Sequence, residues 1–338
     1  MNFIVTAVFF LTLTFSLSGQ EFKSEPFGRE ILTVKSGFNY FGLRFHRRAV
    51  ATGQVTEVTS GSHVIGLPTE VLEPLTLGEF YLFEVDSGNA LGAVIPITSY
   101  NKTTGTITLN DDLSSDLKVW DHFTIRPSAT LASVFGATNE SGMGASASAT
   151  AADQIWFPDG FGGFEQYHFY NANFSGPVNK WYSIVNGLSG QEVNPHQIPI
   201  YYPEGIIIKG NSTVNSFKVS GVLKRTPTTH VIQPHTYHYV SSVYPAGGTI
   251  ESMFGSNNEA SMTGHERVLI PVLTGSNFST YIYQDLSAFG LGANWLQGNN
   301  QIDPSQISFN LHSGYVLFSS APNPRTITVD SPLFYKTL

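Results

Sequence analysis

The sequence contains no cysteine among its 338 residues. Disulfide frameworks, zinc sites with cysteine ligands, iron–sulfur clusters and thiol nucleophiles are therefore excluded. Charge is also scarce, because Asp, Glu, Lys and Arg make up only 12% of the chain, about half of the usual quarter. The formal net charge is −8. A chain this poor in basic residues offers no positive surface to a phosphate backbone, so we expect no nucleic-acid binding.

Long hydrophobic runs are missing except at the N-terminus. Residues 3–17 carry no charge and are followed by the small residues Ser18 and Gly19. This is the length of the apolar region of a signal peptide, although no Lys or Arg precedes it. We therefore expect a signal peptide over residues 1–19 and a secreted protein, in the periplasm, at the cell surface or outside the cell. No later run reaches about 18 apolar residues, so we expect no transmembrane helix.

The residues that are present favour strands. Gly (32 residues) and Pro (18 residues) indicate many turns, and hydrophobic residues at 41% suffice for a packed core. Helical spacing is confined to residues 131–135 and 250–254, each long enough for one or two turns. Short runs rich in β-branched and aromatic residues predict an all-β protein. These runs are residues 54–58, 80–84, 105–109, 123–126, 154–157, 167–170, 197–202, 217–223, 267–272 and 326–329.

Two stretches of the chain resemble each other. Residues 130–136 (TLASVFG) are matched by residues 249–255 (TIESMFG), and residues 194–198 (NPHQI) by residues 303–307 (DPSQI). A pattern that recurs once predicts a duplicated unit rather than a solenoid of many repeats. We expect each copy to form a β-sandwich-like unit.

The first copy contains an insertion. Residues 50–127 form a run of short strands that ends in residues 121–125 (DHFTI), and by analogy of fold this spacing is typical of a small SH3-like β-barrel. The expected organisation is a signal peptide (1–19), N-terminal strands of the first unit (20–49), the inserted barrel (50–127), the first β repeat unit (128–232) and the second (233–338).

Together these motifs resemble an uncharacterised family of secreted β-rich proteins that has many paralogues in Verrucomicrobia-type bacteria. The resemblance rests on the D-x-F-x-I strand, the T-L-x-S-x-F-G turn, the doubled pattern of strand, aromatic residues, Trp, Pro and Gly, and the export signal. It implies an exported β-rich protein and carries over no activity or site residue. Residues 331–338 lack a hydrophobic span followed by basic residues, so we expect no sorting tail.

Metal-ligand patterns are weak. His230, His235 and His238 lie close in sequence, but a spacing of three places two residues on opposite faces of a strand, so surface histidines are the favoured interpretation. Asp111 and Asp112 follow a predicted strand and are interpreted as a turn rather than a calcium site. We predict no metal and no cofactor.

Catalytic patterns are weaker still. Asp159 and Glu165 flank a glycine-rich turn, and a glycoside hydrolase needs two facing carboxylates. The sequence shows no nucleophile elbow, zinc-protease motif, phosphate-binding loop or dinucleotide fingerprint. We therefore predict a protein that is not an enzyme and has no catalytic residues. A hydrolase with an unrecognised site stays an open alternative.

Aromatic residues supply the candidate ligand-binding positions, which are Trp181, Trp295, Tyr201 and Tyr202. Exposed rings in a row bind the faces of sugars. However, Trp181 and Trp295 recur at equivalent places in the two copies, which favours packing over binding unless the rings are exposed.

The preferred function is structural or adhesive, at the cell surface or in the extracellular matrix, with the protein itself or surface polysaccharide as partner. The first alternative is a carbohydrate-binding module that recognises polysaccharide through exposed aromatics. An outer-membrane barrel comes last, because its strands are about ten residues long and those predicted here are shorter.

Overall fold

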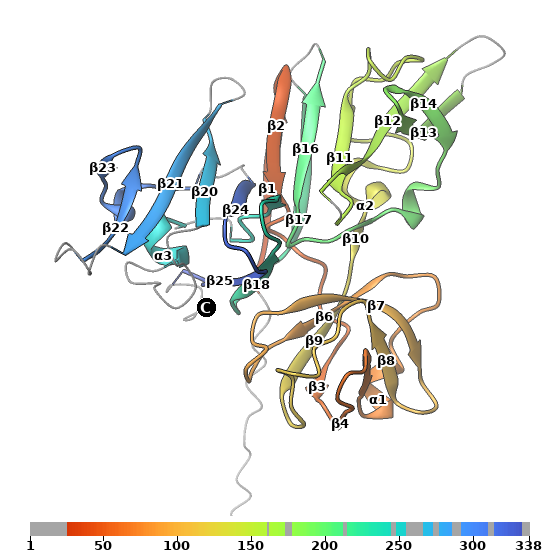
Figure 1. Cartoon of the computed structure of the whole chain (residues 1–338). Coiled ribbons are helices and arrows are strands. Elements are labelled where there is room, and N and C mark those ends of the chain that lie inside the picture. Colours follow the sequence, from red (N-terminus) through yellow and green to blue (C-terminus); the bar gives the residue numbers. More distant parts are fainter. Residues whose placement is uncertain are drawn as a thin grey trace, which may run out of the picture.

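The computed structural model describes residues 26–332 except 161, 173–177, 212–214, 245–247, 255–265, 273–276, 286–291 and 310–313. The predicted signal peptide, residues 1–19, lies outside the described residues. The described chain is almost entirely antiparallel β-structure, which confirms the all-β prediction (Figure 1). Its helical elements are short: α1 (Thr69–Leu72), α2 (Leu131–Phe135), α3 (Ile250–Phe254) and the 3-10 turns η1 (Pro195–Gln197) and η3 (Pro304–Gln306).

Two six-stranded sheets have the same strand order. In the first, the order is β14-β13-β12-β11-β16-β2, and in the second it is β23-β22-β21-β20-β24-β19. The strands of the first are β2 (Gly37–Gly42), β11 (Gln154–Pro158), β12 (Phe164–Ala172), β13 (Val178–Val185), β14 (Leu188–Glu192) and β16 (Gly205–Gly210). The strands of the second are β19 (Tyr237–Val240), β20 (Glu266–Pro271), β21 (Phe278–Asp285), β22 (Ala293–Gln297), β23 (Asn300–Gln301) and β24 (Tyr315–Ser319).

Each sheet is accompanied by matching smaller pairings. Strand β1 (Phe27–Val34) pairs with β17 (Asn215–Val222), and β18 (Thr228–Ile232) pairs with β25 (Arg325–Val329). The pair of β10 (Ala129–Thr130) with β15 (Pro199–Ile200) has its counterpart in a bridge between Thr249 and Ser308. We call β1, β2 and β10–β17 the first unit, and β18–β25 the second unit.

Strand β18 corrects the boundary expected at residues 232 and 233. Its partner is β25, far along the chain in the second unit, and its place corresponds to that of β1 in the first unit. The second unit, as its strands define it, therefore begins at Thr228.

The same local interactions start the short helix of each unit. The Thr130 hydroxyl accepts a hydrogen bond from the Ser133 N–H at 3.2 Å, and the Thr249 hydroxyl accepts one from the Ser252 N–H at 3.1 Å. Such reciprocal caps satisfy N–H groups that the first turn of a helix leaves free. The helices fall where the sequence places one or two helical turns.

The inserted module has a sheet and a core of its own. Its order is β3-β9-β6-β7-β8-β5-β4, with β3 (Ala51–Gln54), β4 (Glu57–Val58), β5 (Val64–Gly66), β6 (Tyr81–Val85), β7 (Val94–Asn101), β8 (Thr106–Leu109) and β9 (His122–Pro127). The outermost strands β3 and β4 follow one another directly in the chain, so the sheet curls into a small, partly closed barrel. Phe83 and Phe123 stack inside it with ring centroids 5.2 Å apart.

Strand β6 is buried on both faces. One face packs in the barrel and the other against the first unit, so the strand joins the two. Alternate side chains point to opposite faces of a strand. Phe83 therefore belongs to the barrel core, whereas Leu82 belongs to the main core that the two units share. On the same side as Leu82, Glu84 forms a buried ion pair with Arg126 at 2.8 Å. Lys224 and His46 are also buried there.

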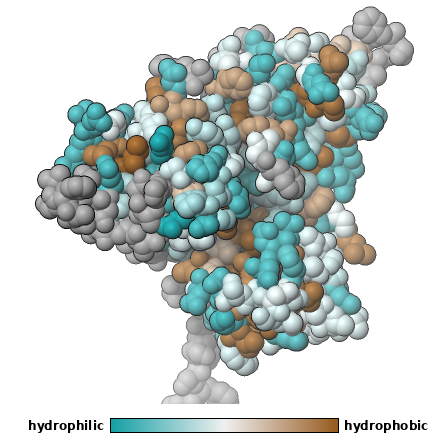
Figure 2. All heavy atoms as spheres, in the orientation of Figure 1, coloured by the Kyte–Doolittle hydropathy of each residue, from teal (hydrophilic) through white to brown (hydrophobic). Residues whose placement is uncertain are grey.

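The two units meet through equivalent residues. Tyr40 of β2 and Tyr239 of β19 occupy matching positions, and their rings stack. A backbone hydrogen bond of 3.1 Å joins the Gly314 N–H to the Tyr40 carbonyl, and Glu204 bridges to Val240 from the first unit to the second. Over the face seen in Figure 2, polar and apolar residues are interspersed on both the sheets and the barrel. No helix in the described part of the chain is long and apolar enough to cross a membrane.

Candidate functional site

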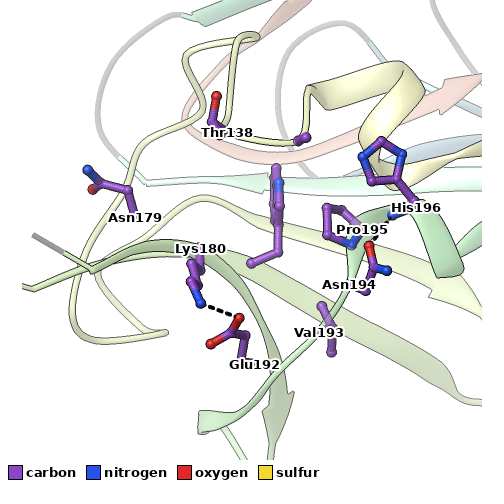
Figure 3. Close-up of a pocket in the computed structure, with 10 residues that line it drawn as sticks. Thr138, Asn179, Lys180, Glu192, Val193, Asn194, Pro195 and His196 are labelled. Atoms are coloured by element: carbon purple, nitrogen blue, oxygen red, sulfur yellow. Dashed lines mark hydrogen bonds and ion pairs between the residues drawn. The ribbon is translucent and has the colours of Figure 1, made fainter.

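A pocket of about 440 Å³ lies at the edge of the first sheet, between the β13–β14 hairpin, η1 and the segment after α2 (Figure 3). We call it the Trp181 pocket. Its polar lining residues are Thr138, Asn179, Lys180, Glu192, Asn194 and His196, and the others are Ala137, Trp181, Val193 and Pro195.

The local sequence explains how the chain turns under this pocket. Strand β14 ends at Glu192, and Pro195 occupies the start of η1, where its fixed backbone angle suits a helical turn. The Asn194 Oδ1 accepts a hydrogen bond from the His196 N–H at 3.1 Å and so caps the turn. The pocket wall is therefore a fixed turn with the polar side chains of Asn194 and His196 exposed on it.

Trp181 lies beneath these side chains and supports them. Its indole is 1% exposed, and its Nε1–H donates to the Gly136 carbonyl at 2.9 Å. Gly136 has φ +92°, in the left-handed region that favours glycine, and a Cβ there would collide with Glu140. The hydrogen bond thus ties the sheet to the end of α2.

The charges in the pocket are paired. The Lys180 ammonium lies 2.6 Å from the Glu192 Oε1, and both side chains are about half exposed. The hydrogen bond and the negative charge of Glu192 raise the pKa of Lys180. Because the pair is neutral as a whole, the pocket offers hydrogen-bond donors and acceptors without a net charge.

The second unit carries the same framework with different side chains. Where the first unit has Lys180 and Glu192, the second has Asn294 and Gln301, joined by an amide hydrogen bond of 2.7 Å. Ser305 takes the place of His196, and the backbone bond from Ile302 to the Trp295 carbonyl repeats the one from Val193 to Trp181. The charged pair of Lys180 and Glu192 therefore has an uncharged counterpart in the second unit. Residues 255–265, which follow α3, lie outside the described residues.

The four aromatic residues named as candidate ligand-binding positions differ in their exposure. Trp181 and Trp295 are each 1% exposed and Tyr202 is buried, whereas Tyr201 is only partly buried. Trp181 packs edge-on against Phe169. Trp295 packs against Tyr283, which is the counterpart of Phe169 in the second unit. The two tryptophans recur because each fills the same place in its unit's core, so neither presents a ring face to a sugar.

The histidines differ from their expected positions. His230 is buried in β18 rather than at the surface, and burial, then the charge of His238, lower its pKa to about 4. The His238 Nε2 accepts a hydrogen bond from the Gln233 N–H at 2.8 Å, while His235 is exposed. No group of three or more His, Asp or Glu residues in the described ranges is placed to hold a metal ion.

The acidic residues of the sequence analysis are engaged in local structure. Asp112 is exposed and accepts a hydrogen bond from the Ser114 N–H, which lowers its pKa. Asp159 accepts one from the Gly163 N–H at 2.9 Å, and Glu165 accepts one from the Tyr167 hydroxyl at 2.8 Å. Asp111 is exposed.

Sequence reasoning missed Glu204. Burial, followed by the charges of Asp159 and Glu165, raises its pKa to about 7. The residue lies where the first unit meets the second, at the bridge to Val240. Its burial depends on a strand from the other unit, so no local pattern in the sequence could have indicated it.

The basic cluster of residues 46–48 is divided between the interior and the surface. Arg47 forms an exposed ion pair with Glu79 at 3.2 Å, and Arg48 is exposed. His46 is buried with its ring centroid 4.0 Å from that of Tyr202. Burial, and then the positive charges of Arg126 and Lys224, hold the pKa of His46 well below its usual value.

Comparisons with models of protein families, with curated proteins and with solved structures found no match. Functional inference therefore depends on the geometry described above.

Proposed function

We propose that this protein is an exported, non-enzymatic adhesive protein that binds polysaccharide in the Trp181 pocket. The observation that carries the proposal is the set of polar side chains exposed around one open cavity of about 440 Å³. Amides, an imidazole, a hydroxyl and a neutral ion pair can donate to and accept from the hydroxyl groups of a sugar. A cavity with a few convergent polar groups is the usual form of a small-ligand site.

The charge of the pocket favours a neutral ligand over an anion. Lys180 is the one lysine or arginine among the lining residues, and Glu192 already neutralises it. A bound carboxylate or phosphate would have to compete with Glu192 for the same ammonium group.

The same pairing argues against hydrolysis. A glycoside hydrolase needs two carboxyl groups on either side of the scissile bond, and Glu192 is the one carboxylate among the residues that line this pocket. Its carboxylate is paired with Lys180, and the lining holds no second carboxyl group for the other role in this mechanism.

Export and surface location belong to the proposal as well. They are supported by the uncharged run at residues 3–17 and the small residues after it. An adhesive role in a surface or matrix then requires contact with polymers outside the cell.

The experiment uses the chain from residue 20 onward in affinity electrophoresis against a panel of soluble polysaccharides. We expect retardation by at least one neutral polysaccharide, reduced at least fivefold by Lys180→Met and by His196→Ala. Lys218→Met is the matched control, since Lys218 is an exposed lysine on β17, away from the pocket lining. Failure of the whole panel to retard the protein, or equal retardation of the pocket variants and wild type, would overturn the proposal.

Self-assembly is the second candidate, and strand β1 is the observation that favours it. β1 pairs with β17 alone among the described strands, and Phe27 and Ile31 on its outer face are 64% and 59% exposed. An exposed apolar edge strand is a template for pairing with another chain. Sedimentation of wild type and of Ile31→Lys tests this: larger particles lost in the variant support assembly, and a monomer at high concentration opposes it.

A further inference from the structure

We propose that Trp120, with Gln54 and His122, forms a separate sugar-binding site at the far end of the inserted barrel. Its ligand is a neutral pyranose sugar, with one face of the sugar ring on the indole and its hydroxyls on the amide and imidazole. The site shares no residue with the Trp181 pocket, so either can exist without the other.

Trp120 is the exposed member of the four tryptophans of the chain. Its side chain is 69% exposed, whereas Trp181 and Trp295 are each 1% exposed and Trp156 is partly buried. Tryptophan has a large apolar surface and is on average highly buried. Leaving the ring in water forgoes the free energy of burying that surface unless a ligand covers it.

The backbone conformation of Trp120 is a second, independent indication that the exposed ring binds a ligand. Its φ is +75°, in the left-handed region that a bulky side chain rarely occupies. Glycine would occupy this position without strain. Strain of this kind persists at sites where function requires a particular side chain in a particular direction.

Hydrogen bonds on both sides hold the backbone at Trp120 in place. The Trp120 N–H donates to the Val55 carbonyl at 2.9 Å, and the Val55 N–H donates to the Asp121 carbonyl at 3.0 Å. The Asp121 carboxylate accepts a bond from the Lys118 N–H at 2.8 Å, which closes the turn around Trp120. A preformed platform loses little conformational freedom when a ligand binds.

Polar groups lie beside the backbone of Trp120. Gln54 at the end of β3 pairs in register with His122 at the start of β9, and their Nε2 atoms are 3.2 Å apart. The Gln54 Nε2 also lies 3.4 Å from the Trp120 carbonyl oxygen. The Gln54 Oε1 makes no hydrogen bond within the described part of the chain, and so can accept one from a sugar hydroxyl. An apolar ring next to an amide and an imidazole matches the apolar face and polar rim of a pyranose.

The neighbouring surface leaves room for more than one sugar. A cavity of about 420 Å³ adjoins Lys118 and Val119, the two residues before Trp120, and three serines contribute hydroxyl groups to it: Ser60, Ser114 and Ser115. The lining contains no carboxylate. The Lys118 ammonium donates to the Ser115 carbonyl at 3.0 Å, and the serine hydroxyls can donate to and accept from those of a sugar.

The topology keeps this end of the barrel accessible. β3 enters the barrel from the first unit and β9 returns to it, so their far ends, at Gln54 and His122, point away from the six-stranded sheets (Figure 1). The turn after β6 borders this end, because the His122 N–H donates to the Ser87 hydroxyl at 2.7 Å. The same turn contacts the second unit, where the Thr229 N–H donates to the Gly92 carbonyl at 2.9 Å.

The test uses the chain from residue 20 onward and a panel of neutral glucose and N-acetylglucosamine hexasaccharides, followed by tryptophan fluorescence. We expect a fluorescence change on binding that Trp120→Ala abolishes, Trp120→Phe retains in part, and Gln54→Ala weakens several-fold. Trp156→Phe is the control for fluorescence from another tryptophan. Trp120→Gly should in addition raise Tm while abolishing binding, because it relieves the left-handed strain; loss of binding through misfolding would lower Tm.

Three results would overturn the site: no member of the panel changes the fluorescence, Trp120→Ala binds like wild type, or Trp120 responds to phosphatidylcholine vesicles instead of sugars. The two sites are told apart by Lys180→Met. If this variant loses polysaccharide binding while the Trp120 signal is unaffected by any sugar, the Trp181 pocket stands and the Trp120 site falls. If Lys180→Met binds polysaccharide like wild type while Trp120→Ala abolishes binding, the Trp120 site stands and the Trp181 pocket falls.

Discussion

Tyr40 and Tyr239 stack on each other with ring planes 6° apart and centroids 6.2 Å apart, and each holds the same position in its own unit. Contact between equivalent residues is the hallmark of a twofold interface, in which one surface patch meets a second copy of itself. The same relation holds for Gly42, where an added Cβ would collide with its counterpart Ser241. The two units therefore pack in the manner of a symmetric dimer within a single chain.

Close backbone approach at this interface predicts the effect of adding a methyl group. A Cβ on Gly314 would lie 2.8 Å from the Phe41 carbonyl oxygen and 2.9 Å from that of Val240, too close for either to remain in place. We expect Gly314→Ala to lower the free energy of unfolding by about 1–3 kcal/mol. Gly205→Ala is the graded control, since its nearest contacts would be at 3.2 Å. Urea unfolding measures both, and an equal or larger loss for Gly205→Ala would contradict the geometry.

The ion pair between Glu84 and Arg126 predicts a large effect at the barrel junction. Both side chains are buried, so Arg126→Met leaves the Glu84 charge without its partner and should cost about 3–5 kcal/mol. Arg47→Met, which breaks the exposed pair with Glu79 nearby, should cost less than about 1 kcal/mol. Thermal or urea unfolding of the two variants checks the contrast, which fails if their losses are similar.

Buried His230 predicts loss of stability in acid. Its pKa is about 4 in the folded protein and 6.5 when unfolded, so the unfolded chain binds the extra proton as the pH falls through this window. The contribution of His230 to stability is complete above about pH 6.5 and declines by up to about 3 kcal/mol toward pH 4. His230→Leu should flatten the decline, whereas His63→Gln, at an exposed position, is the control. Unfolding curves at about pH 7.5, 5.5 and 4.5 span the window, and an unchanged slope in His230→Leu would refute this account.

Glu204 predicts the opposite dependence on pH. Its pKa is about 7 in the folded protein against 4.5 unfolded, so the folded state keeps a proton that the unfolded state releases between these values. The contribution of this residue to stability is therefore lost as the pH rises, by up to about 3 kcal/mol at about pH 8. We expect Glu204→Gln to be more stable than wild type at about pH 8 and equal to it at about pH 4.5. Differential scanning calorimetry decides, and a wild type that is the more stable at the higher pH would show that the carboxylate is stabilised after all.

Local patterns predicted those parts of the fold that local interactions determine. The Thr130 and Thr249 caps, with Ser133 and Ser252 three residues on, can be seen in the sequence because a cap requires only residues three positions apart. The pairing of strand β18 with β25 joins distant parts of the chain, so no local pattern could indicate it.

The candidate site was harder to predict, because exposure is a property of the folded molecule. The recurrence of Trp181 as Trp295 favours a packed ring, but no comparable sequence signal marks Trp120 as exposed, and their exposed fractions are 1% and 69%. The polar lining of the Trp181 pocket likewise comes from separate elements that only the fold assembles.

The barrel leaves the first unit beside the point where it enters, since Ala51 of β3 pairs with Ile125 of β9. In the second unit, by contrast, the chain runs from Val240 to Ile250 with no module between. The connection between the edge strand and the short helix therefore occurs in this molecule both with and without an inserted module. Residues 50–127 also supply Leu82 to the main core and Glu84 beside the buried Lys224. A graft of another small domain should therefore leave the paired sheets intact only if it provides an apolar side chain and a carboxylate at these two places.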